Sequence, residues 1–449
     1  MKKPELAHII AVHMGLGHLR AAYPLRNFSS QGLIIWGSRN YAAPGEKKYW
    51  RLIRKTYYFL SRVGSFPVVG KIGLKIIMAI QRIPSFYPKK DLSRPNLAVR
   101  FLKILIKRAR LCRTLPDYLA SDCLPVINTF YATAIALESL PEKSPGDRKN
   151  FLIICDADIN RVWVPERPAA SRINYLVPCT QVRNRLLTYG VKPENIFMTG
   201  FPLPVENLGT ETGLEVLKID LLARLLRLDP SGKFFAYHRH SVSRWLELKK
   251  IPEDRENHYT VMYAIGGAGA QTDLARRILK SLGPLIRTGR VRLLLSCGVQ
   301  RRVLEKTLKF INQQGLWDEI GRNIHLIFSD NVFEYFELFN RWLRQTDVLW
   351  TKPSELSFYC ALGLPIIMAD PIGPQEELNK RWLMEIHAGL VPPGPPEYCQ
   401  EWLSDLRENG RLAEAAWDGF LKARKLGTYK IKRLIENGEY SEEISPLKQ

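Results

Sequence analysis

Short apolar runs alternate with stretches of helical periodicity along most of the chain. In the N-terminal half, strands are predicted at residues 6–12, 32–36, 125–129, 151–155, 174–177 and 196–199. In the C-terminal half, strands are predicted at 260–265, 292–296, 324–328, 348–351 and 365–369, with helices at 272–282, 301–314, 332–343, 354–362 and 376–386. This alternation is typical of parallel sheets covered by helices, and it predicts an α/β fold.

The segment from residue 203 to 259 breaks the alternation with charged and turn-like patches. A chain of 449 residues is also too long for one ordinary hydrophobic core. We therefore predict two Rossmann-like, doubly wound domains with a cleft between them. The N-terminal domain takes residues 1–205, with a basic insertion at about 45–115; a junction follows at 206–258, the C-terminal domain at 259–395, and helices with a tail at 396–449.

Most of the net charge of +22 lies in one part of the chain. Between Lys47 and Arg113 there are eighteen Lys or Arg residues and one acid, Asp91, which gives +17 within 67 residues. Apolar and aromatic residues interleave with these cations. Basic residues beside an apolar face are what a helix lying in a lipid headgroup layer requires.

We expect this region to bind an anionic membrane surface. The expected contact residues are Trp50, Lys71, Lys75, Arg100, Lys103 and Lys107. Two other interpretations stay open: the helices could pack on their domain with their charges in water, and clustered Lys and Arg also suit contacts with nucleic-acid phosphates. No recognised nucleic-acid module accompanies the charge, which argues against nucleic acid as the partner.

Cysteine usage and the apolar runs indicate the compartment. The seven cysteines are scattered and never spaced as metal-ligand or redox pairs, which is typical of reduced thiols in a cytoplasmic protein. Glu5 and His8 interrupt the first apolar run, so we interpret it as a strand and not as a signal peptide. No stretch reaches the roughly 18 apolar residues of a transmembrane helix. The predicted location is peripheral, on the inner face of the cell membrane.

Two glycine-containing turns each join a predicted strand to a helix. The first, from His13 through Gly15 and Gly17 to His18, follows the first strand, and the second, from Gly266 to Gln271, follows the strand at 260–265. Small residues at such a turn leave backbone N–H groups able to hold a phosphate, and a helix N-terminus favours negative charge. Each turn could also serve only the packing of helix and sheet.

Several motifs together resemble one GT-B glycosyltransferase family, which includes the monogalactosyldiacylglycerol synthases and the peptidoglycan enzyme that adds N-acetylglucosamine to lipid I. The motifs are Gly15-Leu-Gly-His18-Leu-Arg-Ala21-Ala22, the 266–271 loop, Gly363-Leu-Pro-Ile-Ile367, Gln375-Glu376 with Asn379, and the stretch from Asp156 through Trp163 to Gly200-Phe-Pro202. The resemblance implies a nucleotide sugar bound between two Rossmann-like domains.

The resemblance also implies a role for each matching position. His18 would be the base or the group that orients the acceptor, and Asp156 would line the acceptor side. Donor binding would fall to Gly266, Gly267, Ala268, Gly269 and Gln271 at the diphosphate, Lys352 at a phosphate, Glu355 at the ribose, and Gln375 and Glu376 at the sugar hydroxyls. Glu355 could equally be an ordinary acid at a helix start, and Lys352 could pair with a surface acid.

Asp156-Ala-Asp158 also fits the metal-binding Asp-x-Asp of GT-A glycosyltransferases, in which two carboxylates hold a divalent cation. Two glycine-containing loops in two α/β domains favour the GT-B architecture, in which helix dipoles and backbone donors replace the metal. We therefore expect no metal and no cofactor, with the nucleotide sugar as a co-substrate.

The expected function is that of an inverting GT-B hexosyltransferase, with a UDP-sugar as donor and a lipid such as diacylglycerol as acceptor. Two alternatives stay open. One is a soluble nucleotide-sugar 2-epimerase, which would have no need of the basic region. The other is a catalytically inactive GT-B-like protein that binds membranes.

Overall fold

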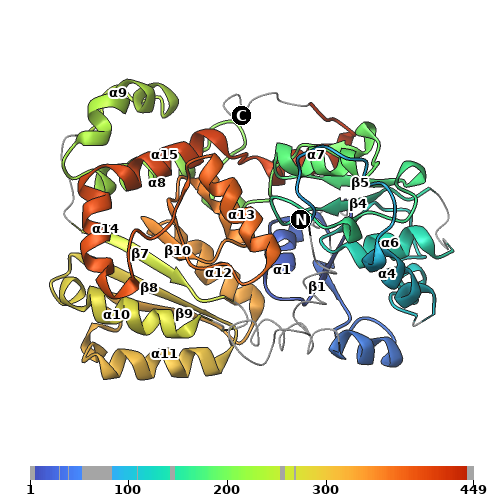
Figure 1. Cartoon of the computed structure of the whole chain (residues 1–449), viewed down its shortest axis with the longest axis horizontal. Helices are drawn as coiled ribbons and strands as arrows, with labels where there is room; N and C mark the ends of the chain where they lie inside the picture. Colours follow the sequence, from blue (N-terminus) through green and yellow to red (C-terminus); the bar gives the residue numbers. More distant parts are fainter. Residues whose placement is uncertain are drawn as a thin grey trace. The chain divides into compact units, whose positions relative to one another are not determined.

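The computed structural model describes residues 6–29, 31–38, 40–52, 83–108, 110–141, 147–252, 258–266, 269 and 271–441. Internal contacts divide the chain into two units. Unit 1 comprises Met1–Leu203, Ile372–Asn379 and Arg424–Gln449, and unit 2 comprises Pro204–Pro371 and Lys380–Ala423. Segments far apart in the sequence therefore fold into the same unit (Figure 1).

In unit 1, six parallel strands form one sheet in the order β2-β1-β3-β4-β5-β6. The strands are β1 (His8–Val12), β2 (Leu33–Trp36), β3 (Val126–Asn128), β4 (Asn150–Ile153), β5 (Ile173–Leu176) and β6 (Ile196–Phe197). Helices that lie wholly within the described residues of this unit are α1 (Gly17–Ala22), α4 (Leu97–Lys107), α5 (Leu115–Tyr118), α6 (Tyr131–Ser139), α7 (Thr180–Thr188) and α16 (Gly427–Asn437), and residues 44–52 are also helical. Every residue of β1 is buried, as expected of an apolar run in the middle of a parallel sheet.

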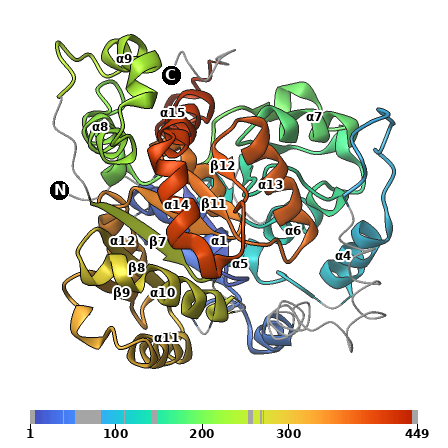
Figure 2. The ribbon, with the colours of Figure 1, turned by 60° about the vertical axis from the view of Figure 1, so that its left-hand side comes forward.

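In unit 2, a second sheet of six parallel strands has the order β12-β11-β10-β7-β8-β9. The strands are β7 (Tyr259–Ala264), β8 (Val291–Gly298), β9 (Ile324–Phe328), β10 (Val348–Thr351), β11 (Ile366–Met368) and β12 (Gly389–Leu390). The helices are α8 (Glu215–Leu228), α9 (Lys233–Trp245), α10 (Thr272–Arg287), α11 (Arg301–Gln313), α12 (Val332–Leu343), α14 (Cys399–Glu408) and α15 (Arg411–Lys422). Helix α14 packs against α10 and α15 (Figure 2). The chain passes between the units within α13 (Pro374–Glu385).

The predicted fold class, α/β with two Rossmann-like domains, is confirmed, and each predicted strand overlaps an observed one. The cleft between the domains stays a prediction. Two details differ from the expected elements. Residues Glu355–Leu362 form a 3-10 helix, η7, in place of the predicted α-helix, and residues 356–362 are buried all round, which leaves no amphipathic pattern. Strand β12 was not expected because two residues at a sheet edge are too few for a periodic signal.

The segment predicted as a junction contains two regular helices, α8 and α9, and belongs to unit 2. Arg224 of α8 is buried, and its guanidinium donates to the backbone oxygens of Thr346, Leu362 and Gly363 at 2.8, 2.8 and 3.2 Å. Burial lowers the pKa of Arg224 to about 10, so the side chain remains charged at neutral pH. These bonds fasten α8 to the segments that enter β10 and β11.

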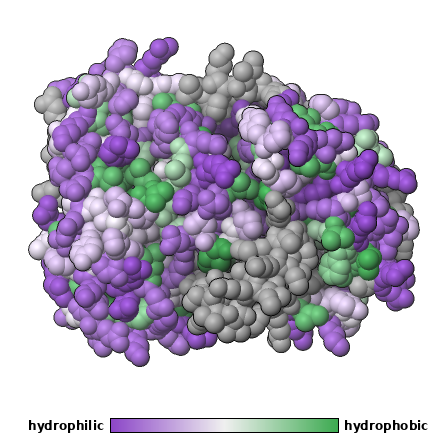
Figure 3. Space-filling model, viewed as in Figure 1, coloured by the Kyte–Doolittle hydropathy of each residue, from purple (hydrophilic) through white to green (hydrophobic). Residues whose placement is uncertain are grey.

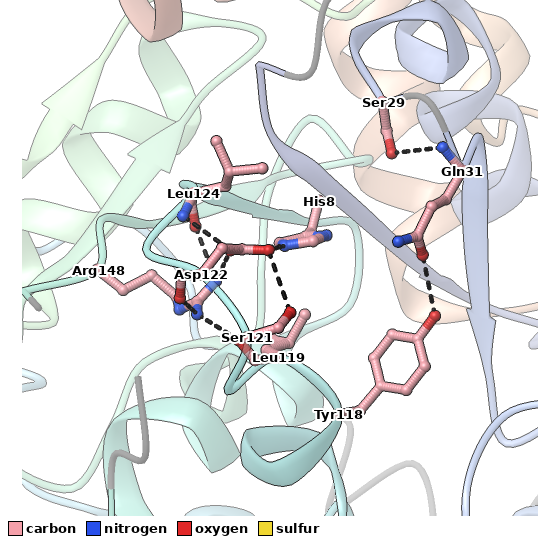
Figure 4. Close-up of polar contacts among 9 residues, drawn as sticks. All are labelled: His8, Ser29, Gln31, Tyr118, Leu119, Ser121, Asp122, Leu124 and Arg148. Atoms are coloured by element: carbon pink, nitrogen blue, oxygen red, sulfur yellow. Dashed lines mark hydrogen bonds and ion pairs between the residues drawn. The ribbon is translucent and has the colours of Figure 1, made fainter. Parts of the chain in front are cut away.

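A polar network ties β1 to the loop that precedes β3 (Figure 4). Nε2 of His8 lies 3.0 Å from both carboxylate oxygens of Asp122. Arg148 donates to the backbone oxygens of Leu124 and Leu119 at 2.8 and 2.6 Å, and its Nη1 lies 3.4 Å from Oδ1 of Asp122. The network therefore fastens the sheet at the end where these strands begin.

Asp158 and Arg185 form a buried ion pair in unit 1. Nε and Nη2 of Arg185 each donate to one carboxylate oxygen of Asp158 at 2.8 Å. Nε2 of Gln181 donates to Oδ2 of Asp158 at 3.0 Å, and the backbone N–H of Ile159 donates to Oδ1 at 2.8 Å. The pair holds the loop after β4 against α7.

Replacing Arg185 with Met is expected to lower the free energy of unfolding of unit 1 by about 3–5 kcal/mol, because Asp158 would stay buried without its cation. Adding Asp158→Asn should recover part of this loss, since a neutral amide costs less to bury than a carboxylate. Urea unfolding of the two variants and the wild type measures both steps. A loss below about 1 kcal/mol for Arg185→Met would contradict a desolvated pair.

Candidate functional site

The strand order in unit 1 reverses next to β1, whose neighbours are β2 on one side and β3 on the other. Ligands of open parallel sheets bind at such a switch point, beside the carboxyl ends of the strands. The glycine loop from Gly15 to His18 follows β1, and Thr129 follows β3. Nδ1 of His18 lies 2.6 Å from the backbone oxygen of Thr129. The fold thus places the predicted residue His18 at the switch point of unit 1.

The contact with Thr129 decides which nitrogen of His18 is basic. A carbonyl oxygen can only accept a hydrogen bond, so Nδ1 of the neutral ring carries the proton and Nε2 is the basic nitrogen. The ring packs edge-on against Phe130 at 5.0 Å between centroids and lies 6.2 Å from Trp163. Gly15 has a φ of 81°, a conformation that suits glycine and lets the chain turn between β1 and α1.

Aromatic side chains continue around His18. Tyr131 packs 5.2 Å from Trp163, and burial raises the pKa of Tyr131 to about 12, so its phenol stays protonated at neutral pH. The thiol of Cys155, at the end of β4, lies 3.8 Å from Nδ1 of His18. Phe130, Trp163 and the Cys155 thiol are thus uncharged neighbours of the imidazole.

The other predicted residues of this region lie on the loop after β4 and on the first turn of α13. Asp156 accepts from Nδ2 of Asn379 at 3.0 Å. Gln375 and Glu376 begin α13, and Oε2 of Glu376 accepts from the backbone N–H of Ile372 at 2.6 Å, which orients this carboxylate. These residues belong to unit 1, although the sequence places 375 and 376 in the C-terminal domain.

The two aspartates of Asp156-Ala-Asp158 have different partners. Asp156 is bonded to Asn379, whereas both carboxylate oxygens of Asp158 are engaged by Arg185 within the buried pair. Two carboxylates that share one cation must turn toward the same point. Asp158 therefore has a structural role.

Unit 2 has a switch point of its own at β7, which lies between β8 and β10. Gly266 follows β7 and Lys352 follows β10. A Cβ atom built on Gly266 would lie 3.0 Å from Cε of Lys352, so the lysine side chain passes directly over the glycine backbone. The fold thus brings together two predicted donor residues that are 86 positions apart in the sequence.

The described residues at the helix end of the second glycine loop, Gly269 and Gln271, are anchored. Gly269 has a φ of 66°, and its N–H donates to the oxygen of Gly266 at 2.7 Å. Nε2 of Gln271 donates to the backbone oxygen of Asp370 at 2.8 Å. Glu355 begins η7, three residues after Lys352. The predicted residues Gly267 and Ala268 lie outside the described residues.

Two site residues were not predicted to act: Thr129, whose carbonyl orients His18, and Cys155 beside it. Their residue types are too common at strand ends to stand out in a sequence. Only the order of the strands, with β3 between β1 and β4, places both beside the glycine loop.

The predicted membrane residue Trp50 is buried, with an exposed fraction of 5%, which corrects that expectation. The carboxylate of Glu46 accepts hydrogen bonds from the indole N–H groups of Trp36 and Trp50 at 2.6 and 3.1 Å and from the backbone N–H of Cys112 at 2.9 Å. A Cβ on Gly37 would lie 2.5 Å from Cγ of Trp50, so the indole packs against bare backbone. A buried carboxylate requires such donors, so the hydrogen bond to Glu46 keeps the Trp50 indole buried.

Helix α4 carries the other predicted basic residues that the structure describes. Leu97, Phe101 and Ile104 follow one face of the helix with exposed fractions of 75%, 57% and 49%, while Leu102 and Ile106 pack inward. Arg100, Lys103 and Lys107 are exposed beside this apolar stripe, and Lys103 pairs with Glu166. Figure 3 shows apolar residues at the surface of the region that α4 occupies in Figure 1. Lys71 and Lys75 lie outside the described residues.

Among the residues that the structure describes, no helix is long and apolar enough to span a membrane. On α4, exposed apolar side chains lie beside cations, a pattern that helices lying on a lipid surface also have.

Comparison with known proteins gives a distant relative. The chain is 22% identical to the processive diacylglycerol beta-glucosyltransferase of Bacillus subtilis (strain 168) over 270 residues, which are 59% of this chain and 56% of that enzyme. The match thus spans little more than half the length of this relative. Residues 249–434 match the model of a family described as Domain of unknown function (DUF6938).

Two solved structures are also similar. A UDP-GlcNAc 2-epimerase from Neisseria meningitidis bound to UDP-GlcNAc is 12% identical, with a TM-score of 0.40 and coverage of 96% of this chain and 100% of that chain. The glycotransferase of kitacinnamycin is 11% identical, with a TM-score of 0.42 and coverage of 94% and 95%. At TM-scores below 0.5, neither likeness bears on function. The sequence match makes the chain a distant relative of a lipid glycosyltransferase.

Neutral His18 is expected to carry its proton on Nδ1, because the Thr129 carbonyl accepts from that nitrogen. NMR of protein labelled with ¹⁵N-histidine distinguishes the two tautomers by the chemical shift of the unprotonated nitrogen. A His18→Gln variant assigns the signals of this residue among the eight histidines. Protonation of Nε2 in the neutral ring would contradict the assignment of Nε2 as the base.

Proposed function

We propose that the protein is an inverting glycosyltransferase that moves a hexose from a UDP-sugar to a lipid acceptor, such as diacylglycerol, at a membrane surface. The observation that carries the proposal is that each sheet has the predicted residues at its own switch point, His18 in unit 1 and the Gly266 loop with Lys352 in unit 2. The relative from Bacillus subtilis supports a lipid acceptor.

The donor would bind by its diphosphate at the second glycine loop. Backbone N–H groups at the start of α10 and the Lys352 ammonium supply positive charge to the diphosphate without a metal. Gln375 and Glu376 are proposed to hydrogen-bond the sugar hydroxyls, and Glu355 the ribose.

The reaction would be one displacement at the anomeric carbon. The acceptor hydroxyl oxygen attacks this carbon while Nε2 of His18 takes the hydroxyl proton. Asp156 lies on the acceptor side and assists the acceptor hydroxyl. The bond between the anomeric carbon and the diphosphate oxygen breaks, and its electron pair leaves with UDP. Lys352 stabilises the negative charge that develops there. A single displacement inverts the configuration of an α-linked donor.

The acceptor would be reached from a lipid surface on the cytoplasmic side. Insertion of the apolar stripe of α4 buries Leu97, Phe101 and Ile104 among acyl chains, and the flanking cations contact anionic headgroups. A peripheral position of this kind suits an enzyme whose acceptor stays in the bilayer.

The purified chain is expected to convert UDP-glucose, UDP-galactose or UDP-N-acetylglucosamine to UDP and a β-linked glycolipid in the presence of vesicles that contain diacylglycerol. His18→Ala should lower kcat by about 10²–10⁴, the usual contribution of a general base. Product analysis and UDP release measure both. Full activity of His18→Ala would overturn the role of that residue.

The same assay separates the alternatives. Conversion of a free UDP-sugar without lipid would identify a 2-epimerase. Absence of turnover together with absence of heat in a calorimetric UDP-sugar titration would identify an inactive membrane-binding protein.

Replacing Leu97, Phe101 and Ile104 together by Ser is expected to weaken binding to phosphatidylglycerol vesicles at least about tenfold, since each apolar side chain contributes on the order of 1.5–3 kcal/mol when fully buried. Cosedimentation at two salt concentrations measures binding and its electrostatic part. Ile219→Ser on α8, which also removes an exposed apolar side chain, is the matched control and should bind as the wild type does. Unchanged binding of the triple variant would exclude α4 as the docking face.

A further inference from the structure

Asn379 is fully buried on α13 and contacts the loop after β4 within unit 1. Its Oδ1 accepts from the backbone N–H of Ala157 at 2.7 Å, and its Nδ2 donates to Oδ1 of Asp156 at 3.0 Å. A backbone N–H can only donate, so the orientation of the amide is determined, with its NH₂ group toward the Asp156 carboxylate. One side chain thus bonds both the backbone and the side chain of neighbouring residues.

Asn379 also lies on the face of α13 that carries Gln375 and Glu376. Glu376 precedes it by three positions and Gln375 by four, and residues at these spacings neighbour one another on a helix surface. The bonds from Asn379 therefore orient the helix face that carries both residues.

We propose that Asn379 is a positioning residue, which holds the Asp156 carboxylate and the Gln375–Glu376 face of α13 in one arrangement. The inference rests on the proposed function, in which Asp156 assists the acceptor and residues 375 and 376 hold the sugar. A transferred group and an attacking hydroxyl must meet with little positional freedom, and a displacement of about 1 Å can cost about a hundredfold in rate. A buried amide without rotational freedom supplies this constraint.

An exchange of the two side chains tests the proposal. In Asn379→Asp, two carboxylates face each other, so we expect the Ala157 amide to exchange its hydrogen about ten- to a hundredfold faster. Asp156→Asn alone keeps an oxygen that accepts from Asn379 and should leave this exchange nearly unchanged. The double variant places the carboxylate at 379 and the amide at 156, which restores both hydrogen bonds and should restore slow exchange.

Hydrogen exchange of the peptide that contains Ala157, followed by mass spectrometry, measures these effects without any substrate. The matched control is Asn207→Asp, which replaces a buried amide in unit 2 that donates to the backbone oxygen of Asn340 at 2.8 Å. The effect of Asn207→Asp on hydrogen exchange should be the same with and without Asp156→Asn. Additive effects of Asn379→Asp and Asp156→Asn on the Ala157 amide would overturn the proposal.

Turnover of UDP-glucose with diacylglycerol vesicles gives the second readout. Asn379→Asp should lower kcat about ten- to a hundredfold, with a smaller change in KM, because misalignment affects the chemical step more than binding. The double variant should regain slow exchange while kcat stays low, since the carboxylate is no longer at 156. Recovery of kcat would overturn the catalytic part assigned to Asp156 and support the positioning role. A wild type without turnover would overturn the proposed function, and the exchange coupling would still decide whether Asn379 holds the loop.

Discussion

The direction of the strands is the constraint on which the rest of the structure depends. In a parallel sheet, all carboxyl ends lie along one edge, and loops diverge only where the strand order reverses. In unit 1 this point lies beside β1, and in unit 2 beside β7. Each unit has a glycine loop after this first strand and a polar group after the neighbouring strand, the Thr129 carbonyl in one and Lys352 in the other.

Buried polar groups hold the loops of unit 1 around this edge. Glu46 accepts hydrogen bonds from two indoles and a backbone amide, Asp158 forms an ion pair with Arg185, and Asn379 is hydrogen-bonded to the loop after β4. Each is costly to bury alone and stable only with its donors in place, so each allows one arrangement of its loop. Polar groups at the opposite end of the sheet, around His8 and Asp122, fasten the strands where they begin.

In the basic region at about 45–115, composition alone does not predict which side chains are exposed. Its charge and apolar content point to a lipid surface, yet one of its aromatic residues, Trp50, is part of the core, and one of its cations, Lys103, pairs with Glu166. On α4, the exposed apolar residues are Leu97, Phe101 and Ile104, and the tertiary structure decides which apolar side chains of the helix face inward and which stay at the surface.

The sequence by itself determined the α/β class, the position of every predicted strand and the two glycine loops, because burial on both faces and a strand-to-helix turn leave local patterns. Tertiary structure alone decided which strands are neighbours. It thereby set the pairing of His18 with Thr129 and of Gly266 with Lys352. The tertiary structure also decided the structural role of Asp158 and the burial of Trp50. The contacts of His18 with Thr129 and of Gly266 with Lys352 join residues far apart in the chain, and no local pattern specifies a partner that follows another strand.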